Sequence, residues 1–411
     1  MVKKTKKVEK FQQFKEFHDF FWAPNTLCLT LGFDFNQTLS SKWKPLLYLL
    51  TACELTMHIY TRSNLLQGLC RTIIQRDLQQ ISSAATFVIY GFDSNMKLSS
   101  LLYHRKLLLK TYNILKTCYP LKPEELSLYR VNEHHGTSAK PVLIVINYIT
   151  VCLIIVGPLL ESVVTYVYDW LVLPADELQF IFLKPFPVKY SFDYTRSAAT
   201  YLLVYVIEVV NSVFTIHSLL AADMWLLCLT AQIIMHFQYI AKRLESYKPC
   251  LENEVKDCKF LTDIIEKHQM MLNLYENLNV IFGLSLATNL FTTSFLLCCV
   301  AVQLTVHEIG IYFLKYCMFQ ITVVGNFYMI YSYGERLTTS SADIAEAAYK
   351  SQWYNGSRAY KKLLLTLITR AQKQAELTTK GYQKISLSTF QSVMGMSYRV
   401  FTLLQSVIDL N

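Results

Sequence analysis

Long apolar stretches alternate with polar, basic links along the whole chain, and they divide it into predicted membrane helices. A helix needs about 20 apolar residues to cross a bilayer. Seven segments are assigned as spans: 42–66, 79–103, 141–168, 198–241, 270–305, 310–333 and 385–408. The second is the weakest, because Asp93 and Lys97 interrupt it. The pattern predicts an all-α, polytopic membrane protein with seven transmembrane helices in a single domain, 1–411.

The links between these spans complete the predicted organisation. Spans one to six occupy 42–333, and the fourth and fifth are too long for one crossing, so their helices should continue into the cytosol. Residues 334–384 are amphipathic, which indicates a cytosolic helical hairpin or a re-entrant segment. Residues 1–41 form a basic N-terminal segment without an apolar stretch before a cleavage site, so no signal peptide is expected.

Composition agrees with a membrane protein. The chain is 53% hydrophobic and only 17% charged, whereas soluble domains carry about 25% charged residues. The basic residues also fix the expected orientation. The segment up to Lys44 and the links after spans two, four and six together hold 30 of the 39 Lys and Arg residues. Because positive charge stays in the cytosol during insertion, the N-terminus is expected inside and the C-terminus outside, with 169–196 as an extracellular link.

This orientation excludes a G-protein-coupled receptor, whose N-terminus is extracellular. The link 169–196 contains no cysteine to tether span three, and neither an Asp-Arg-Tyr motif after span three nor an Asn-Pro-x-x-Tyr motif in span seven is present. Most cysteines lie in spans or cytosolic links, where thiols stay reduced, so no structural disulfide is expected.

Catalytic patterns are absent from the sequence. There is no phosphate loop, no Gly-x-Gly-x-x-Gly, no His-Glu-x-x-His and no Cys-x-x-Cys motif. His134 and His135 lie in a polar basic link, where solvated side chains are the better interpretation. Ionisable residues inside spans usually face another helix, water or a partner charge; these are Asp93, Glu161, Glu208 and Asp223. No enzyme activity, cofactor, metal or nucleic-acid partner is expected.

The last span carries one polar stripe. At helical spacing, six small or polar residues share a face, and these are Ser388, Gln391, Gly395, Tyr398, Thr402 and Gln405. Lipid cannot satisfy such groups, so the stripe must face protein or water. Two interpretations stay open: an intramolecular helix contact, or the wall of an aqueous path shared by several copies.

The C-terminal third resembles the signature of insect odorant receptors. It contains the Ala-x-Tyr-x-x-x-Trp run (Ala347, Tyr349, Trp353), the Arg-x-Gln of Arg370 and Gln372, the Leu-Ser…Phe of Leu387, Ser388 and Phe390, and Ser397-Tyr398. "LGFDF", "LLAADMWLLCLTAQIIMHFQYIAKRLE" and "LFTTSFLLCC" upstream are similar to fly members. The resemblance covers essentially the whole chain.

The chain departs from the family pattern at three points, and two of them help to place it within the family. Gln374 stands where many relatives have proline, which affects only a local turn. The link 242–269 is short, whereas the co-receptor of the family carries a long insertion there, so the chain resembles a ligand-tuning subunit. Ser397-Tyr398 followed by Gln405-Ser406 differs from the gustatory pattern and favours the odorant branch.

The resemblance implies the odorant-binding subunit of a ligand-gated, non-selective cation channel, a heterotetramer with the co-receptor in the plasma membrane of sensory dendrites. It implies an apolar pocket for a small volatile ligand among spans two, three, four and six, with 169–196 as its lid, a cytosolic anchor hairpin at 334–384 and a pore-lining last span at 385–408. The expected pocket residues are Phe87, Tyr90, Gly157, Tyr201, Tyr205, Ser212, Tyr316 and Phe319. The expected anchor residues are Tyr349, Trp353, Leu363, Leu364, Leu367 and Ile368. The expected pore-lining residues are Gln391, Gly395, Tyr398, Thr402 and Gln405.

Other functions stay open at this point. A seven-span chemoreceptor that signals through a soluble partner, or a gustatory-type receptor channel, shares most of these features. A transporter is less favoured, because no internal inverted repeat and no Gly/Pro-interrupted pair of helices is found.

Overall fold

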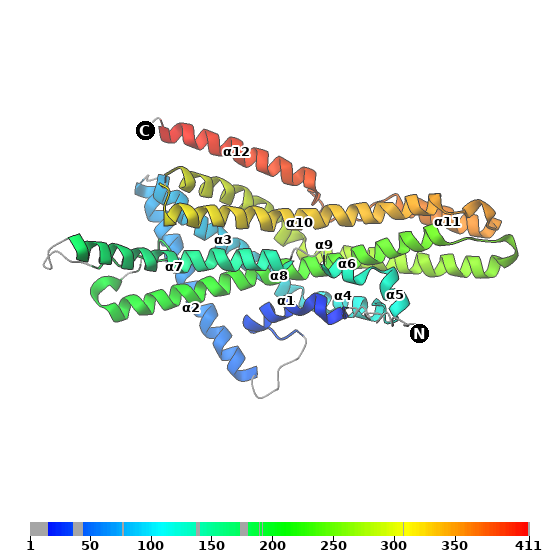
Figure 1. Cartoon of the computed structure of the whole chain (residues 1–411), viewed down its shortest axis with the longest axis horizontal. Coiled ribbons are helices and arrows are strands. Elements are labelled where there is room, and N and C mark those ends of the chain that lie inside the picture. The colour runs from blue at the N-terminus through cyan, green and yellow to red at the C-terminus, as the bar shows by residue number, and fades with distance from the viewer. Residues whose placement is uncertain are drawn as a thin grey trace, which may run out of the picture.

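The protein is an elongated bundle of long helices in a computed structural model (Figure 1). The structure describes residues 15–35, 44–75, 78–136, 140–172, 180–188, 190, 192–306 and 308–409. The predicted N-terminal segment 1–41 and the predicted lid 169–196 therefore lie partly outside the described residues.

Twelve α-helices are described, and they are α1 Phe17–Thr30, α2 Lys44–Gln75, α3 Leu78–Tyr103, α4 Arg105–Cys118, α5 Pro123–Leu128, α6 Val131–Gly136, α7 Lys140–Val172, α8 Ala198–Ser246, α9 Glu254–Val306, α10 Ile311–Lys350, α11 Arg358–Ala371 and α12 Leu387–Asp409. Short 3₁₀ turns lie at Tyr194–Arg196, Leu251–Asn253 and Trp353–Asn355. No β-strand occurs in the described part of the chain. The all-α fold is confirmed.

Seven of the described helices are at least 23 residues long: α2, α3, α7, α8, α9, α10 and α12. Each coincides with one predicted span. By length and composition alone, three stretches of the described chain are apolar enough to cross a membrane: Pro141–Val172, Ala198–Ser246 and Leu251–Val306. The other long helices carry more polar residues, and several of these meet polar partners inside the bundle. A threshold on mean hydropathy therefore does not identify these helices as membrane spans.

Helices α8, α9 and α10 extend well beyond a single bilayer crossing. At about 1.5 Å per residue, the 49 residues of α8 and the 53 residues of α9 span more than twice the ~30 Å hydrocarbon core. Their far ends gather with α11 at one end of the molecule, while α2, α7 and α12 lie at the other end (Figure 1). The C-terminal half of α10 and α11 together form the helical hairpin within 334–384.

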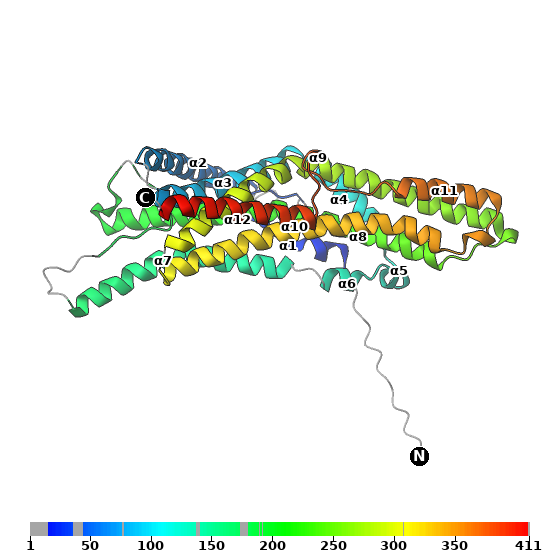
Figure 2. The same ribbon diagram turned by 90° about the horizontal axis from the view of Figure 1, so that it is seen from above.

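The packing around α12 differs from that of the other long helices. Figure 2 shows α12 along the outer side of the bundle, over α9 and α10. Before it, the chain makes a turn in which Thr378 bridges to Lys384. That turn passes close to α10, because a Cβ on Gly334 would lie 2.3 Å from the carbonyl oxygen of Ile385. Glycine at 334 is therefore required for this approach.

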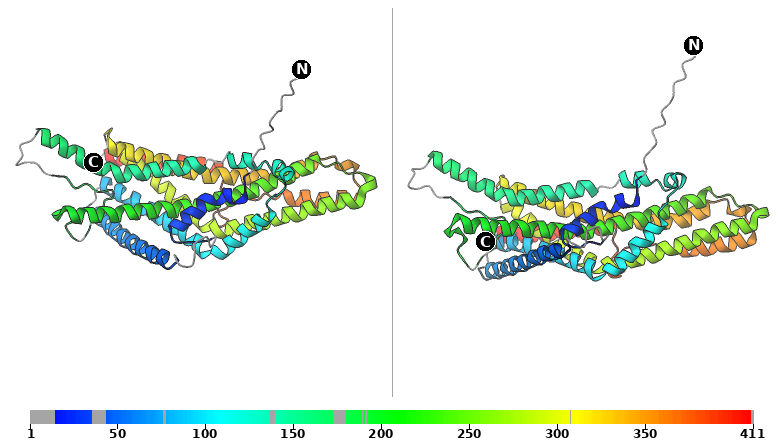
Figure 3. Two further views of the ribbon diagram at one scale, coloured as in Figure 1. Left: turned by 60° about the horizontal axis from the view of Figure 1, so that its bottom comes forward. Right: turned by 90° about the horizontal axis from the view of Figure 1, so that it is seen from below.

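Two separate groups of buried apolar residues stabilise the bundle. The main cluster joins α1, α3, α4, α8, α9, α10 and α11, and Trp225 and Phe237 are among its fully buried side chains. The cavity cluster is much smaller, and its buried members are Leu65, Phe87, Ile154, Phe186, Val188, Leu296, Leu297, Val300, Tyr316, Phe319 and Val323. Helix α1 packs on the outside of α8, as the views of Figure 3 show.

Candidate functional site

A small cavity, here called the inner cavity, lies where α2, α3, α7, α8 and α10 meet. Its volume is about 30 Å³, which is room for about one water molecule. The walls are mostly apolar and aromatic, and they are formed by Arg62, Phe87, Tyr90, Val151, Ile154, Phe186, Ser212, Thr215, Ile216 and Phe319. As it stands, the inner cavity is too small for an organic ligand.

A second, larger cavity, here called the outer cavity, lies next to it. Its volume is about 400 Å³, within the range of small-molecule sites. The lining comes from α3, the end of α9, the start of α10 and the link between α7 and α8. It consists of Gln79, Gln80, Ser83, Phe87, Phe182, Leu183, Lys184, Pro185, Phe186, Pro187, Tyr194, Gln303, Tyr312, Lys315 and Tyr316.

The α7–α8 link (described at 180–188, 190 and 192–197) folds back onto the helices and forms one wall of the outer cavity. Leu183 accepts a hydrogen bond from Tyr201 Oη at 2.7 Å, and its N–H donates to Ser162 Oγ at 3.3 Å. The Phe186 N–H donates to Glu208 Oε2 at 3.3 Å. Helices α7 and α8 therefore hold the link in place, and Phe186 itself is buried in the cavity cluster.

Two charged side chains fix the other half of this link. Glu208 on α8 accepts a hydrogen bond from Tyr190 Oη at 3.0 Å, and Lys184 Nζ donates to the carbonyl of Val188. The Lys184 ammonium also lies over the rings of Tyr190 and Tyr194, 4.8 and 4.3 Å from their centroids. Burial lowers the pKa of Lys184, and the Glu208 carboxylate partly offsets this effect.

Arg62 on α2 is a cavity residue that the sequence did not single out. Its Nη1 donates to the carbonyl of Phe87 at 2.9 Å, and its Nη2 donates to Thr215 Oγ1 at 2.6 Å. A Cβ on Gly91 would lie 1.9 Å from Nη1, so the glycine makes room for the guanidinium. The sequence feature that could have identified Arg62 is the presence of a basic residue within the apolar segment of span one.

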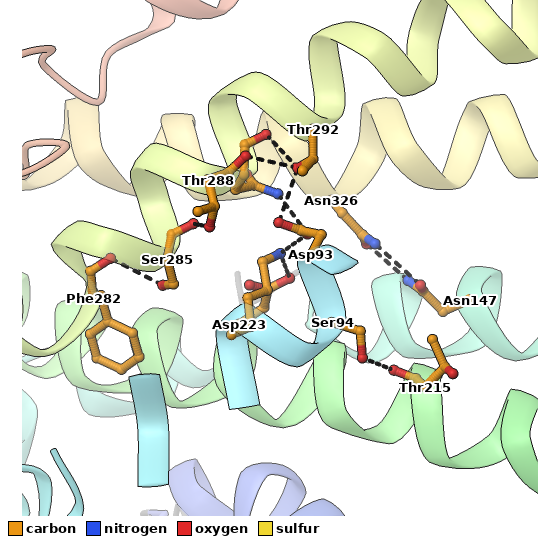
Figure 4. Close-up of polar contacts among 12 residues, drawn as sticks. Asp93, Ser94, Asn147, Thr215, Asp223, Phe282, Ser285, Thr288, Thr292 and Asn326 are labelled. Carbon is orange, nitrogen blue, oxygen red and sulfur yellow. Dashed lines mark hydrogen bonds and ion pairs between the residues drawn. The ribbon is translucent and has the colours of Figure 1, made fainter. Parts of the chain in front are cut away.

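A buried polar cluster lies deeper in the bundle. Lys97 Nζ is 3.2 Å from Asp93 Oδ2 and 3.0 Å from Asp223 Oδ2. On the other side, Asp93 accepts hydrogen bonds from Asn289 Nδ2 at 3.2 Å and Thr292 Oγ1 at 3.0 Å. Figure 4 shows Asp93 between Asp223 and Thr292, with the nearby Asn147–Asn326 pair. The cluster joins α3 to α8 and α9, so the charges that weakened span two are paired inside the protein.

The eight predicted pocket residues divide into three groups. Phe87, Tyr90, Ser212 and Phe319 line the inner cavity, and Tyr316, with Phe87, lines the outer cavity. Tyr201 and Tyr205 instead use their hydroxyls to tie helices and link together, donating to the carbonyls of Leu183 and Ile155. Gly157 packs near Ile311, which a Cβ would meet at 3.6 Å. These last three residues line neither cavity.

The predicted polar stripe of α12 lies mainly on its exposed face. Gln391, Gly395, Tyr398 and Thr402 are exposed, and Gln405 is half-buried. The face toward α9 is a different one, and Ser397 is buried there, with its Oγ 3.4 Å from the carbonyl of Ser294. The stripe therefore does not form the contact between α12 and the rest of this chain.

The predicted anchor residues differ in their surroundings. Leu364 and Leu367 are buried within the chain's own main cluster, and Trp353, Leu363 and Ile368 are partly buried against it. Tyr349 is 71% exposed, and Tyr354 and Leu365 are exposed beside it. The hairpin thus has one apolar face packed against the main cluster and a second apolar face that is exposed on the surface of this chain.

Within the described ranges, no group of three His, Cys, Asp or Glu side chains is arranged to hold a metal ion. All eleven cysteines are free thiols.

A bundle of seven long helices, with cavities between some of them and a link that lines the outer cavity, is the architecture of a seven-helix membrane receptor. The family model "7tm Odorant receptor" matches residues 77–398, and the chain belongs to this family. Among curated proteins, it is 32% identical to Odorant receptor 49a of Drosophila melanogaster over 95% of this chain and 98% of that one. It is 29% identical to Odorant receptor 85f of the same species, with the same coverage.

A solved structure shows the same fold. The olfactory receptor OR5 of Machilis hrabei, determined in complex with eugenol, matches with a TM-score of 0.78 and 16% identity, covering 96% of this chain and all of that one. The predicted family and the seven-helix membrane fold are thus confirmed. The family consists of odorant receptors, and no enzyme family is indicated.

Proposed function

We propose that the chain is the odorant-binding subunit of a ligand-gated, non-selective cation channel. In this proposal it assembles as a heterotetramer with the co-receptor of its family in the plasma membrane of olfactory dendrites. The N-terminus is cytosolic and the C-terminus extracellular. The α7–α8 link is the lid of a pocket for a small volatile molecule.

The observation that carries this proposal is the exposed polar stripe on α12. Tyr398 is 67% exposed, and Gln391, Gly395 and Thr402 share its face. A polar helix face cannot lie against lipid without leaving hydrogen-bonding groups unsatisfied. Because the face points away from this chain's own bundle, it fits an aqueous path bounded by several subunits.

The cavities and the hairpin support the same proposal. An outer cavity of about 400 Å³ suits a small organic molecule. The exposed side of the hairpin, with Tyr349, Tyr354 and Leu365, supplies an apolar surface for a neighbouring subunit. In this assignment Leu364 and Leu367 stabilise the hairpin itself rather than touching the partner.

The test is an electrical recording in cells that express the chain with and without the co-receptor. With it, odour should evoke a fast cation current that persists without nucleotides and under G-protein blockade. Alone, the chain should give little current. A current that needs a soluble signalling protein would favour a receptor of the indirect type and would overturn the channel proposal. Robust current from the chain alone would overturn the subunit assignment.

A further inference from the structure

Lys315, in the second turn of α10, is a buried cation on the wall of the outer cavity. Its side chain is only 6% exposed, although it borders a cavity of about 400 Å³. The ammonium lies over three aromatic rings, 5.6 Å from the centroid of Phe87, 5.1 Å from that of Tyr312 and 4.9 Å from that of Tyr316. These ring faces attract a cation, but they offer no lone pair to its three N–H donors.

No oxygen acceptor is found for this ammonium among the described residues. None of the ion pairs or hydrogen bonds in those ranges involves Lys315 Nζ. Glu161 on α7 is close enough to influence it electrostatically, yet Oε2 of this carboxylate is buried without a hydrogen-bond partner. Lys184, the other lysine of the cavity, donates to the carbonyl of Val188. Lys315 therefore differs from Lys184 in having donor capacity to spare.

Neighbouring polar side chains of the outer cavity, Gln303, Ser83 and Tyr316, already form hydrogen bonds within the protein. Gln303 Nε2 donates to the carbonyl of Gln79 at 2.9 Å and to Ser82 Oγ. Ser83 Oγ and Tyr316 Oη are 3.1 Å apart and share a hydrogen bond. A buried charge without hydrogen bonds is costly, so an incoming acceptor gains more at Lys315 than at these groups.

Charge balance favours a neutral acceptor over an ionised acid. Lys184 and Lys315 at the cavity have two carboxylates nearby, Glu208 and Glu161, which act on them electrostatically. A carboxylate ligand would add an excess negative charge and would lose its own hydration on burial. A ketone or ester carbonyl accepts the same N–H with a much smaller desolvation cost.

We propose that Lys315 is the hydrogen-bond donor that selects a small neutral carbonyl compound in the outer cavity. The carbonyl oxygen lies on Nζ, and the hydrocarbon part packs on the rings of Phe87, Phe182 and Phe186. This assignment rests on the proposed odorant-binding role, and it adds the chemical class of ligand and the residue that recognises it.

The test measures binding to the purified full-length receptor complex, independently of current. The probes are a series of methyl alkyl ketones, from propyl to decyl, each paired with the hydrocarbon in which a methylidene group replaces the oxygen, and with the fatty acid anion of equal length. Ligand-induced thermal stabilisation gives the half-saturating concentration. The best ketone should saturate the wild type at a concentration at least about tenfold lower than its hydrocarbon, as expected for one hydrogen bond from a charged donor.

Variants then assign the effect to Lys315. Lys315→Met should remove the preference of ketone over hydrocarbon, and Lys315→Arg should keep most of it. Lys242→Met, which removes an exposed lysine of α8, is the matched control and should leave the preference unchanged. If Lys315→Met does not fold, the infrared carbonyl band of the bound ketone in the wild type still decides, because a hydrogen bond to an ammonium lowers its frequency.

Several results would overturn the assignment. They are equal binding of every ketone and its hydrocarbon, an unshifted carbonyl band, or tighter binding of the fatty acid anions. Equal loss of stability in Lys315→Met and Glu161→Gln with the ketone preference intact would make the lysine a structural partner of Glu161. Recording current from the same complexes distinguishes a failure of the Lys315 assignment from a failure of the proposed channel function. Ligand binding that depends on Lys315 without any evoked current would support the assignment and contradict the channel proposal.

Discussion

The rings of Phe87 on α3 and Phe186 in the α7–α8 link meet edge to face, with their centroids 4.9 Å apart and an interplanar angle of 80°. Both side chains line the inner cavity and the outer cavity. The pair is therefore the common wall of the two spaces. A ligand that passes from the outer cavity into the inner cavity must displace at least one of these rings.

Replacing this wall should widen the ligand range. Phe87→Ala should join the two cavities, so that longer or branched ligands activate the receptor, while small ligands lose potency because they lose an aromatic contact. The expected cost in stability is about 3 kcal/mol, near the lower end for a Phe→Ala change, since a cavity already adjoins the site. Dose–response curves over a homologous ester series, with thermal stability in parallel, measure both effects.

Phe92→Ala is the control for that experiment. Phe92 lies on the same helix but is 51% exposed, so its removal should leave the ligand range unchanged. An unaltered chain-length preference in Phe87→Ala would show that the two cavities do not act as one binding space.

The second prediction concerns the cluster of Asp93, Lys97 and Asp223. Lys97→Met should destabilise the protein by about 3–5 kcal/mol, because it leaves two buried carboxylates without their shared cation. Asp223→Asn should be much milder, since Lys97 keeps its ion pair with Asp93 at 3.2 Å and the cluster becomes neutral. Thermal unfolding of purified protein and surface expression measure the difference. The reverse order of stability would mean that Lys97 is not the residue that compensates these charges.

The third prediction concerns the exposed stripe of α12. Gln405→Arg should depress cation current, because a fixed positive charge at about 4 Å costs a cation about 1 kcal/mol in water, or roughly fivefold in occupancy. Gln405→Ala should alter relative permeability with ligand sensitivity nearly unchanged. Thr402→Leu should favour the closed state, since a larger apolar ring dewets more readily. Single-channel recording with the co-receptor measures these changes, which should be graded because other subunits contribute to the same ring.

Leu403→Val is the matched change beside the stripe, and it should affect expression more than permeation. If it changed conductance while both Gln405 variants did not, the conducting path would lie on another surface of the assembly.

The fourth prediction concerns sidedness. An epitope tag after Asn411 should be labelled by antibody on intact cells, whereas a tag before Met1 should be labelled only after permeabilisation. The reason is the concentration of 30 of 39 Lys and Arg residues in links on one side of the predicted spans. Labelling of the N-terminal tag alone on intact cells would reverse the orientation and place the α7–α8 link in the cytosol.

Apolar periodicity located the long helices, but it did not explain the charges within them. The sequence marked Asp93 and Lys97 as a weakness of span two. In the structure they are stabilised by one another and by Asp223, which follows Lys97 by 126 residues in the sequence. The pattern of apolar and polar residues within one helix does not show which residue of another helix pairs with its charges. The same applies to His58, whose imidazole lies 2.7 Å from Asn211 Oδ1 across the bundle.

The cavity was predicted less well than the fold, for a related reason. Aromatic residues at a suitable depth include cavity walls such as Phe319 and helix ties such as Tyr205, and spacing along a helix does not separate the two. Lys315 was missed, although a lone lysine among aromatic residues in span six was a visible signal. Its importance depends on the absence of an acceptor for its ammonium among the described residues of the neighbouring helices, which only the three-dimensional arrangement reveals.

The separation of the main cluster from the cavity cluster has a consequence for how such a receptor diversifies. Substitutions at Phe87, Phe319 or Tyr316 act on the smaller group, while α1, α4, α11 and the long ends of α8 and α9 are held together by the other. If the cavity binds the ligand as proposed, a substitution there loses contacts of the cavity cluster and leaves the buried contacts of the main cluster in place. The residues that shape the cavity can therefore be exchanged for others of similar volume while the same helical scaffold is kept.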